Sequence, residues 1–216
     1  MNINYLFGNW QQLLKFMGIN DEVTIKKTFT LIVDNYSSLG RYYHNLEHIE
    51  QVLITIELLK KNTNFSQSVD LAAWFHDIIY DSQAQDNEER SAEYGRKLLI
   101  PLNIDDDIID NTCRLILNTK YHKAEINDFD SYVLLDADLS ILGSNLEEYH
   151  NYSKAIRQEY SWVADEKYIA SRKVILESFL QRRIFFTDEL FNRLEFAARE
   201  NIQAEIKFLS QQDSKL

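Results

Sequence analysis

Two short segments organise this chain. The first spans residues 42–48 and reads YYHNLEH; the second, 28 residues after His48, is the pair His76-Asp77 inside an otherwise apolar run. Positions i and i+4 lie on one face of a helix, so a helix beginning here would bring His44 and His48 into one pocket. A charged pair inside a core-like helix is costly unless something compensates it, and a divalent cation is the commonest compensation. The two segments therefore predict a metal site.

The composition predicts one helical, soluble domain. The chain has 216 residues, 45% of them hydrophobic, which is enough to bury a sizeable core. The chain has only one proline and five glycines, so residues that favour turns are few, and this favours long helices joined by short loops. Cys113 is the only cysteine and cannot form an internal disulfide. The start of the chain lacks the pattern of a signal peptide, and no stretch stays apolar long enough to cross a bilayer, so we expect a cytoplasmic protein.

The charge balance bounds the partners. A formal net charge of −11 speaks against binding a nucleic-acid polymer through its phosphate backbone, because that mode needs clustered Lys and Arg. Small anionic substrates remain possible, since a bound cation can recruit a phosphate locally. The tyrosine- and phenylalanine-rich C-terminal helices could cover the core or form the face of a homo-oligomer.

Apolar residues at helical spacing predict an all-α, single-domain bundle over residues 1–210. We expect a metal-site core at about 42–142, a C-terminal helical extension of two or three helices at about 145–210, and a frayed tail at 211–216. A polar connector is expected at Asn62–Ser68. The core helices are predicted at about Tyr5–Met17, from the cap Asp21 to Tyr36, Asn45–Lys60, Val69–Tyr80, Asn87–Ile100, Asp105–Asn118 and Tyr132–Leu142.

With these residues in view, the chain resembles the HD superfamily of metal-dependent phosphohydrolases, all-helical enzymes named for their His-Asp dipeptide. The resemblance rests on a histidine, the His-Asp pair 28 residues later and a distal aspartate, and it covers roughly Tyr42–Leu142. Residues 136–163 are similar to an uncharacterised bacterial branch of predicted HD phosphohydrolases. The resemblance implies an HD-type helical bundle.

Two local matches imply roles for individual residues. Residues 43–48 are similar to the YHNxxH segment of cyclic-nucleotide phosphodiesterases, in which the first histidine is a proton donor and the second a metal ligand. By position, His44 becomes the general acid and His48 a ligand, together with His76 and Asp77. Asp77 is also a candidate to take a proton from the attacking water.

The distal ligand implied by the resemblance is Asp138. Residues 137–140 match the Ala-Asp-Leu-Ser of the same phosphodiesterases, whose aspartate is the far metal ligand. Asp136 points roughly 200° away on a helix, so both are not expected to bind the ion directly, and Asp136 stays open as the alternative. The chain lacks the further His and Gly that follow His-Asp in the phosphodiesterases, so their second metal and cyclic-nucleotide specificity do not carry over. We expect one ion.

Four further residues are weaker candidates. His122 occupies a region where several HD branches carry an additional histidine, and a surface-loop role is the alternative. Lys120 and Arg41 are candidate phosphate contacts, although most exposed cations are only solvated. Glu88 could support a ligand or a water from outside the ligand set, but charge at a helix N-terminus explains it nearly as well.

The resemblance thus implies metal-dependent hydrolysis of a phosphate ester, a nucleotide or another small phosphorylated metabolite. Two imidazoles and two carboxylates suit Zn, Mn, Fe, Ni or Mg, and the spacing does not choose among them. Two alternatives come from other classes. One is a non-catalytic binding or scaffold protein stabilised by the metal, and the other is a di-iron oxygenase of the HD fold, which would need extra ligands such as His122.

Overall fold

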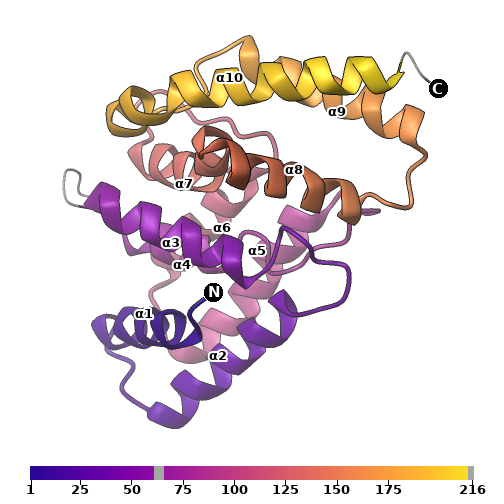
Figure 1. Ribbon diagram of the computed structural model, residues 1–216. Coiled ribbons are helices and arrows are strands. Elements are labelled where there is room, and N and C mark those ends of the chain that lie inside the picture. The colour runs from indigo at the N-terminus through magenta and orange to yellow at the C-terminus, as the bar shows by residue number, and fades with distance from the viewer. Residues whose placement is uncertain (61–65, 214–216) are drawn as a thin grey trace. The chain divides into compact units, whose positions relative to one another are not determined.

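The protein is all-helical in the computed structural model, which describes residues 1–60 and 66–213. The prediction of an all-α fold is confirmed for these residues, which contain no strand (Figure 1). The α-helices are α1 (Ile3–Phe16), α2 (Glu22–Tyr36), α3 (Leu46–Lys60), α4 (Gln67–Phe75), α5 (Asn87–Leu99), α6 (Asp106–Thr119), α7 (Phe129–Leu139), α8 (Leu146–Glu159), α9 (Asp165–Leu180) and α10 (Asp188–Asp213), with 3₁₀ turns η1 (Ile100–Leu102) and η2 (Ser140–Gly143).

The chain divides into two compact units, Met1–Leu134 and Leu135–Leu216, and the border falls within α7. None of the described helices is long and apolar enough to cross a membrane.

Helix α4 is the centre of the first unit. Seven of its nine residues are buried, all except Gln67 and Asp70. It packs against α3, α5 and α6. Its C-terminal end is held by aromatic rings, since Trp74 meets the Trp10 ring edge-to-face at 5.6 Å and the Tyr36 hydroxyl donates to the Trp74 carbonyl at 3.0 Å. The segment that follows α4 is therefore anchored on a rigid element.

Both predicted ends of the helix that leads to His76-Asp77 are wrong. The apolar run predicts a helix over Val69–Tyr80, but α4 ends at Phe75 and His76-Asp77 lies in the turn that follows. Ile78 is buried although it is outside the helix, so the apolar pattern continues where the helix does not. His44 lies in the turn before α3, in agreement with a helix that begins at about Asn45. The predicted connector Asn62–Ser68 lies partly outside the described residues, and α4 begins at Gln67.

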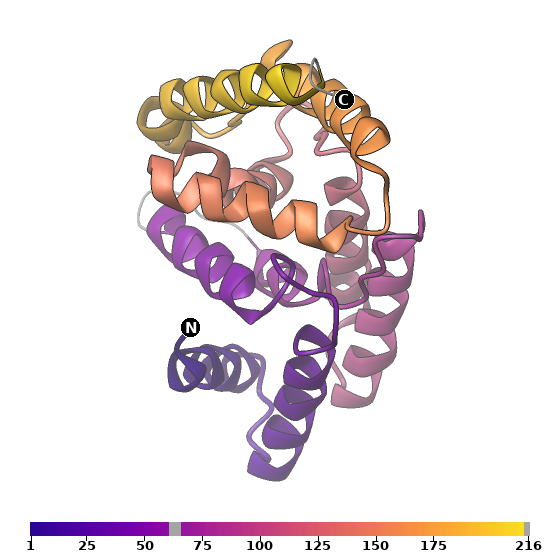
Figure 2. The same cartoon turned by 45° about the vertical axis from the view of Figure 1, so that its right-hand side comes forward.

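The second unit contains the C-terminal helices. Helices α9 and α10 lie side by side in both views (Figure 1 and Figure 2), and α10 also packs against η2. Arg172 on α9 and Glu205 on α10 form a buried ion pair at 2.9 Å, and the Tyr149 hydroxyl on α8 donates to Glu205 at 2.6 Å. Residues 211–213 of the predicted tail continue α10, and residues 214–216 lie outside the described ranges.

Candidate metal centre

His48 is carried by the first turn of α3. Asn45 starts this helix, because its Oδ1 accepts a hydrogen bond from the Glu47 N–H at 2.8 Å and its carbonyl accepts from the Ile49 N–H at 3.3 Å. The His48 side chain lies beside the apolar stripe that α3 buries and is only 4% exposed. Its ring also packs against the Tyr43 ring, with centroids 4.8 Å apart.

His76 lies at the C-terminal end of α4, and a hydrogen bond there determines which of its ring nitrogens carries the proton. Its Nδ1 lies 3.0 Å from the Ala73 carbonyl, which has only lone pairs, so Nδ1 carries the proton. In the neutral ring Nε2 is then unprotonated, the arrangement typical of a metal-binding histidine whose other nitrogen is anchored by a carbonyl. His76 is 1% exposed.

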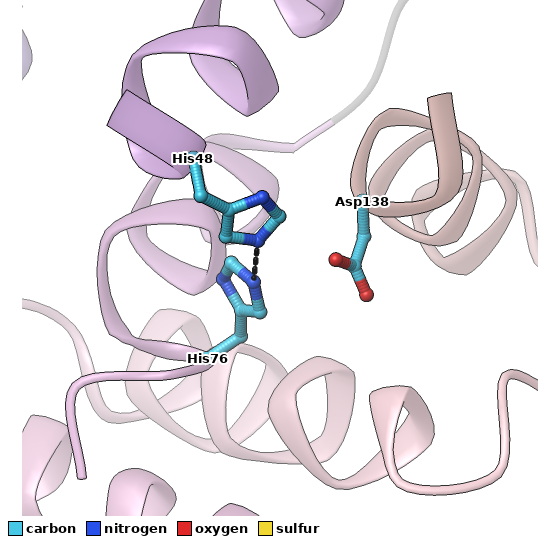
Figure 3. Close-up of side chains that lie close together, drawn as sticks. All are labelled: His48, His76 and Asp138. Carbon is cyan, nitrogen blue, oxygen red and sulfur yellow. Dashed lines mark hydrogen bonds between the residues drawn. The ribbon is translucent and has the colours of Figure 1, made fainter. Parts of the chain in front are cut away.

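Three possible ligand atoms meet in the first unit. His48 Nε2 lies 3.1 Å from His76 Nε2 (Figure 3), and Asp77 Oδ2 lies 3.6 Å from the first nitrogen and 3.3 Å from the second. Atoms that carry lone pairs or negative charge repel one another at such distances unless a proton or a cation lies among them. Ligands about 2.0–2.2 Å from one ion stand roughly 2.8–3.6 Å apart, as neighbours in octahedral geometry or in tetrahedral geometry. The three atoms therefore fit a divalent cation.

The electrostatics keep Asp77 ionised. In the metal-free protein, burial by itself raises the pKa of Asp77, whereas His76, when protonated, lowers it through its charge and hydrogen bond, and the charges of protonated His44 and His48 lower it further. The net result is a pKa below the ordinary range of an aspartate. An ionised carboxylate beside two imidazoles is the protonation state that metal coordination requires.

His44 lies next to this group on the turn before α3. Its ring stacks on the Tyr80 ring, with centroids 4.2 Å apart and an interplanar angle of 24°. Its centroid is 6.0 Å from that of His48. The ring is half-buried, so it keeps some access to solvent. An imidazole in this place could exchange a proton with a molecule bound beside His48.

The two acids of α7 have different surroundings in the second unit. Asp136 is fully buried, and its carboxylate accepts hydrogen bonds from the backbone N–H groups of Phe186 and Thr187, both at 2.7 Å, and from the Thr187 hydroxyl at 2.6 Å. Burial raises the pKa of Asp136 to about 6 despite these bonds. Asp138 is half-buried. The Asp136 carboxylate is thus engaged in holding the segment that leads into α10.

The weaker candidates are held mainly by other parts of the protein. Lys120 pairs with Glu89 and donates to the Gln85 carbonyl at 2.8 Å, so it ties the end of α6 to the start of α5. Glu88 is half-buried in the first turn of α5. His122 follows α6 with a left-handed backbone, at a φ of 47°. Roles of these residues at the site stay predictions.

Arg41 has surroundings that the sequence did not predict. Its guanidinium donates to the backbone carbonyls of His44, Asp77 and Ile78 and to the Ser38 hydroxyl, rather than standing open to a ligand. Tyr80, on which His44 stacks, was likewise not among the predicted site residues. Backbone carbonyls leave no mark in a side-chain pattern, so only the position of Arg41 three residues before His44 could have drawn attention to it.

Comparisons of the chain with protein-family models, with curated proteins and with solved structures found no match.

Proposed function

We propose that this protein is a divalent-metal-dependent hydrolase of phosphate esters, acting on a nucleotide or another small phosphorylated metabolite. The observation that carries the proposal is the group of three buried or half-buried ligand atoms, His48 Nε2, His76 Nε2 and Asp77 Oδ2, with a fourth titratable ring, His44, beside it. The resemblance of residues 42–142 to HD phosphohydrolases supports the reaction class.

The proposal takes Asp138 as the fourth ligand. The similarity of residues 137–140 to the Ala-Asp-Leu-Ser of the phosphodiesterases supports this choice. The engagement of the Asp136 carboxylate by Phe186 and Thr187 supports the same choice, since a carboxylate that accepts three hydrogen bonds has little capacity left for an ion.

Different side chains of the protein take the separate proton-transfer steps of the hydrolysis. A bound divalent cation would supply polarisation of a phosphoryl oxygen and a lowered pKa for a water molecule. The Asp77 carboxylate is the candidate acceptor for the proton of the attacking water. Protonated His44 gives a proton to the leaving oxygen, a role that suits imidazole because its ordinary titration lies near neutral pH. Stacking on Tyr80 fixes the plane of the His44 ring for this transfer.

The test is metal analysis combined with a panel of phosphate esters. Purified protein is stripped, reloaded with Mn, Mg, Ni, Co or Zn, and assayed for phosphate release. We expect His48→Ala and Asp77→Ala to lose the ion and at least about 100-fold in rate, since each removes a ligand. His150→Ala is the matched control, because His150 is exposed on α8, and it should keep both.

Other outcomes separate the rival functions. Full activity in His48→Ala or Asp77→Ala would contradict the proposal. A bound ion that stabilises the protein without turnover of any ester would favour the scaffold reading. Two irons per chain and consumption of dioxygen would favour oxidation.

A further inference from the structure

Arg41 joins the two segments that carry the candidate site. Its Nη1 donates to the His44 carbonyl at 2.9 Å and to the Asp77 carbonyl at 2.7 Å, and its Nη2 donates to the Ile78 carbonyl at 2.7 Å. Its Nε donates to the Ser38 hydroxyl at 3.0 Å. At least four of the five N–H bonds of the guanidinium are thus committed to the protein.

The same guanidinium lies against two aromatic rings. Its central carbon is 5.0 Å from the centroid of the Tyr36 ring and 5.6 Å from that of Tyr80. Tyr36 is fixed in turn, because it is buried and its hydroxyl donates to the Trp74 carbonyl on α4. Tyr80 is the ring on which His44 stacks. Arg41 therefore contacts both the backbone of His44 and Tyr80, the ring on which the His44 side chain stacks.

We propose that Arg41 is a positioning residue that holds His44 at a fixed place beside the His76-Asp77 turn, and that it does not bind the phosphate of the substrate. The inference rests on the proposed function for its kinetic meaning. A planar guanidinium can bond carbonyls of both segments at once, which a point charge such as lysine cannot do. Phosphate recognition by arginine uses two parallel N–H bonds, and those of Arg41 are largely taken by carbonyls.

The first test does not need activity. In protein labelled at histidine, the His44 ring protons should show an upfield ring-current shift from the stacked Tyr80 ring, assigned by its loss in His44→Gln. We expect Arg41→Gln to move this signal toward the position of an unstacked histidine, with Arg41→Lys shifting in the same direction by a smaller amount. An unchanged His44 signal in both variants would overturn the proposal.

Arg157 supplies a matched control. In the second unit it makes a similar mixture of contacts, donating to the carbonyls of Tyr160 and Val163 at 2.7 and 3.0 Å and lying 4.5 Å from the centroid of the Tyr168 ring, with an additional ion pair to Asp165 at 2.6 Å. Arg157→Gln should leave the His44 signal and the metal content unchanged, even if it lowers the melting temperature. Comparison of the two variants separates a local effect of Arg41 on His44 from a general loss of stability.

The second test uses leaving groups of different basicity. A positioned proton donor matters for phenyl phosphate and little for 2,4-dinitrophenyl phosphate, so Arg41→Gln should lose about 100-fold in kcat on the first and less than about 5-fold on the second. The double variant Arg41→Gln/His44→Gln should be no slower than His44→Gln. A uniform loss across both esters, carried by KM, would show phosphate binding and overturn the proposal.

Metal content completes the design. Arg41→Gln should keep the ion; loss of the ion with a normal His44 signal would mean that Arg41 supports the ligands instead, and would overturn the proposal. If the unmodified protein hydrolyses no ester, the proposed function fails, while the His44 signal still decides whether Arg41 positions that ring.

Discussion

The hydrogen bond between His76 Nδ1 and the Ala73 carbonyl sets what this site can bind. Because the proton is held on Nδ1, Nε2 faces His48 with a lone pair, and Asp77 adds a negative charge 3.3 Å away. The residues proposed to bind an ion differ from those that hold these candidate ligands in place. Ala73 and Arg41 belong to the second group: Ala73 acts through its own carbonyl, and the Arg41 guanidinium acts by donating to carbonyls of other residues.

At this scale, the two acids of α7 give a paired prediction. Asp138→Asn should weaken metal binding by about 100-fold, since it removes the charge of the proposed fourth ligand. Asp136→Asn should leave metal binding unchanged and should cost about 1–3 kcal/mol in metal-free protein, because an NH2 group replaces one of the two oxygens that accept from the Phe186 and Thr187 N–H groups.

The measurements are metal titration and urea unfolding in the presence of a chelator. A loss of metal affinity in Asp136→Asn with normal affinity in Asp138→Asn would mean that the distal ligand has been assigned to the wrong residue.

Among the helices, most of the first unit could be predicted from its sequence. The limits of α2 follow from Asp21, whose side chain accepts hydrogen bonds from the Val23 and Thr24 N–H groups, and from the turn after Tyr36. The end of α4 could not be predicted, because Ile78 continues the apolar pattern after the backbone has left the helix. The length of α10 was missed as well, since polar residues continue a helix when no proline or glycine stops it.

The same contrast applies to the candidate site. The approach of His48 to His76 and Asp77 could be predicted, because their residue types and spacing form a recognisable motif. The role of Arg41 could not be predicted, because it donates hydrogen bonds to backbone carbonyls in turns, and a pattern of side chains does not indicate where those carbonyls lie.

The packing of α8, α9 and α10 gives a prediction of pH-dependent stability. Burial raises the pKa of Glu205, but its hydrogen bond and charge interaction with Arg172 and the Tyr149 bond lower it more, so its pKa is below the ordinary value. The stabilisation is therefore fully present above about pH 4.3 and is lost as the pH falls through the folded pKa. Glu205→Gln leaves Arg172 buried without its charge partner and should cost about 3–5 kcal/mol at neutral pH.

The measurement is the free energy of unfolding of both proteins between pH 7 and pH 3. The difference should be constant at neutral pH and should shrink in the acid range. Glu177→Gln, at an exposed position on α9, is the control and should show no such difference. A Glu205→Gln deficit that persists unchanged at the lowest pH would show that the ion pair is not its cause.

For the whole molecule, an ion bound only by the folded state must raise the stability of the fold. At a free metal concentration 100 times the dissociation constant the gain is about 2.7 kcal/mol. We expect a chelator to lower the melting temperature of the unmodified protein and to have no effect on His48→Ala. Equal shifts in both proteins would place the stabilising ion elsewhere.

The most direct measurement of the central claim is an anomalous difference map from crystals of the protein grown with Mn²⁺ or Zn²⁺ and recorded at the absorption edge of that metal. The account predicts one strong peak within coordination distance of His48 Nε2, His76 Nε2 and an oxygen of Asp77. Full occupancy at some other place, with these three side chains bonded only to one another or to water, would contradict it.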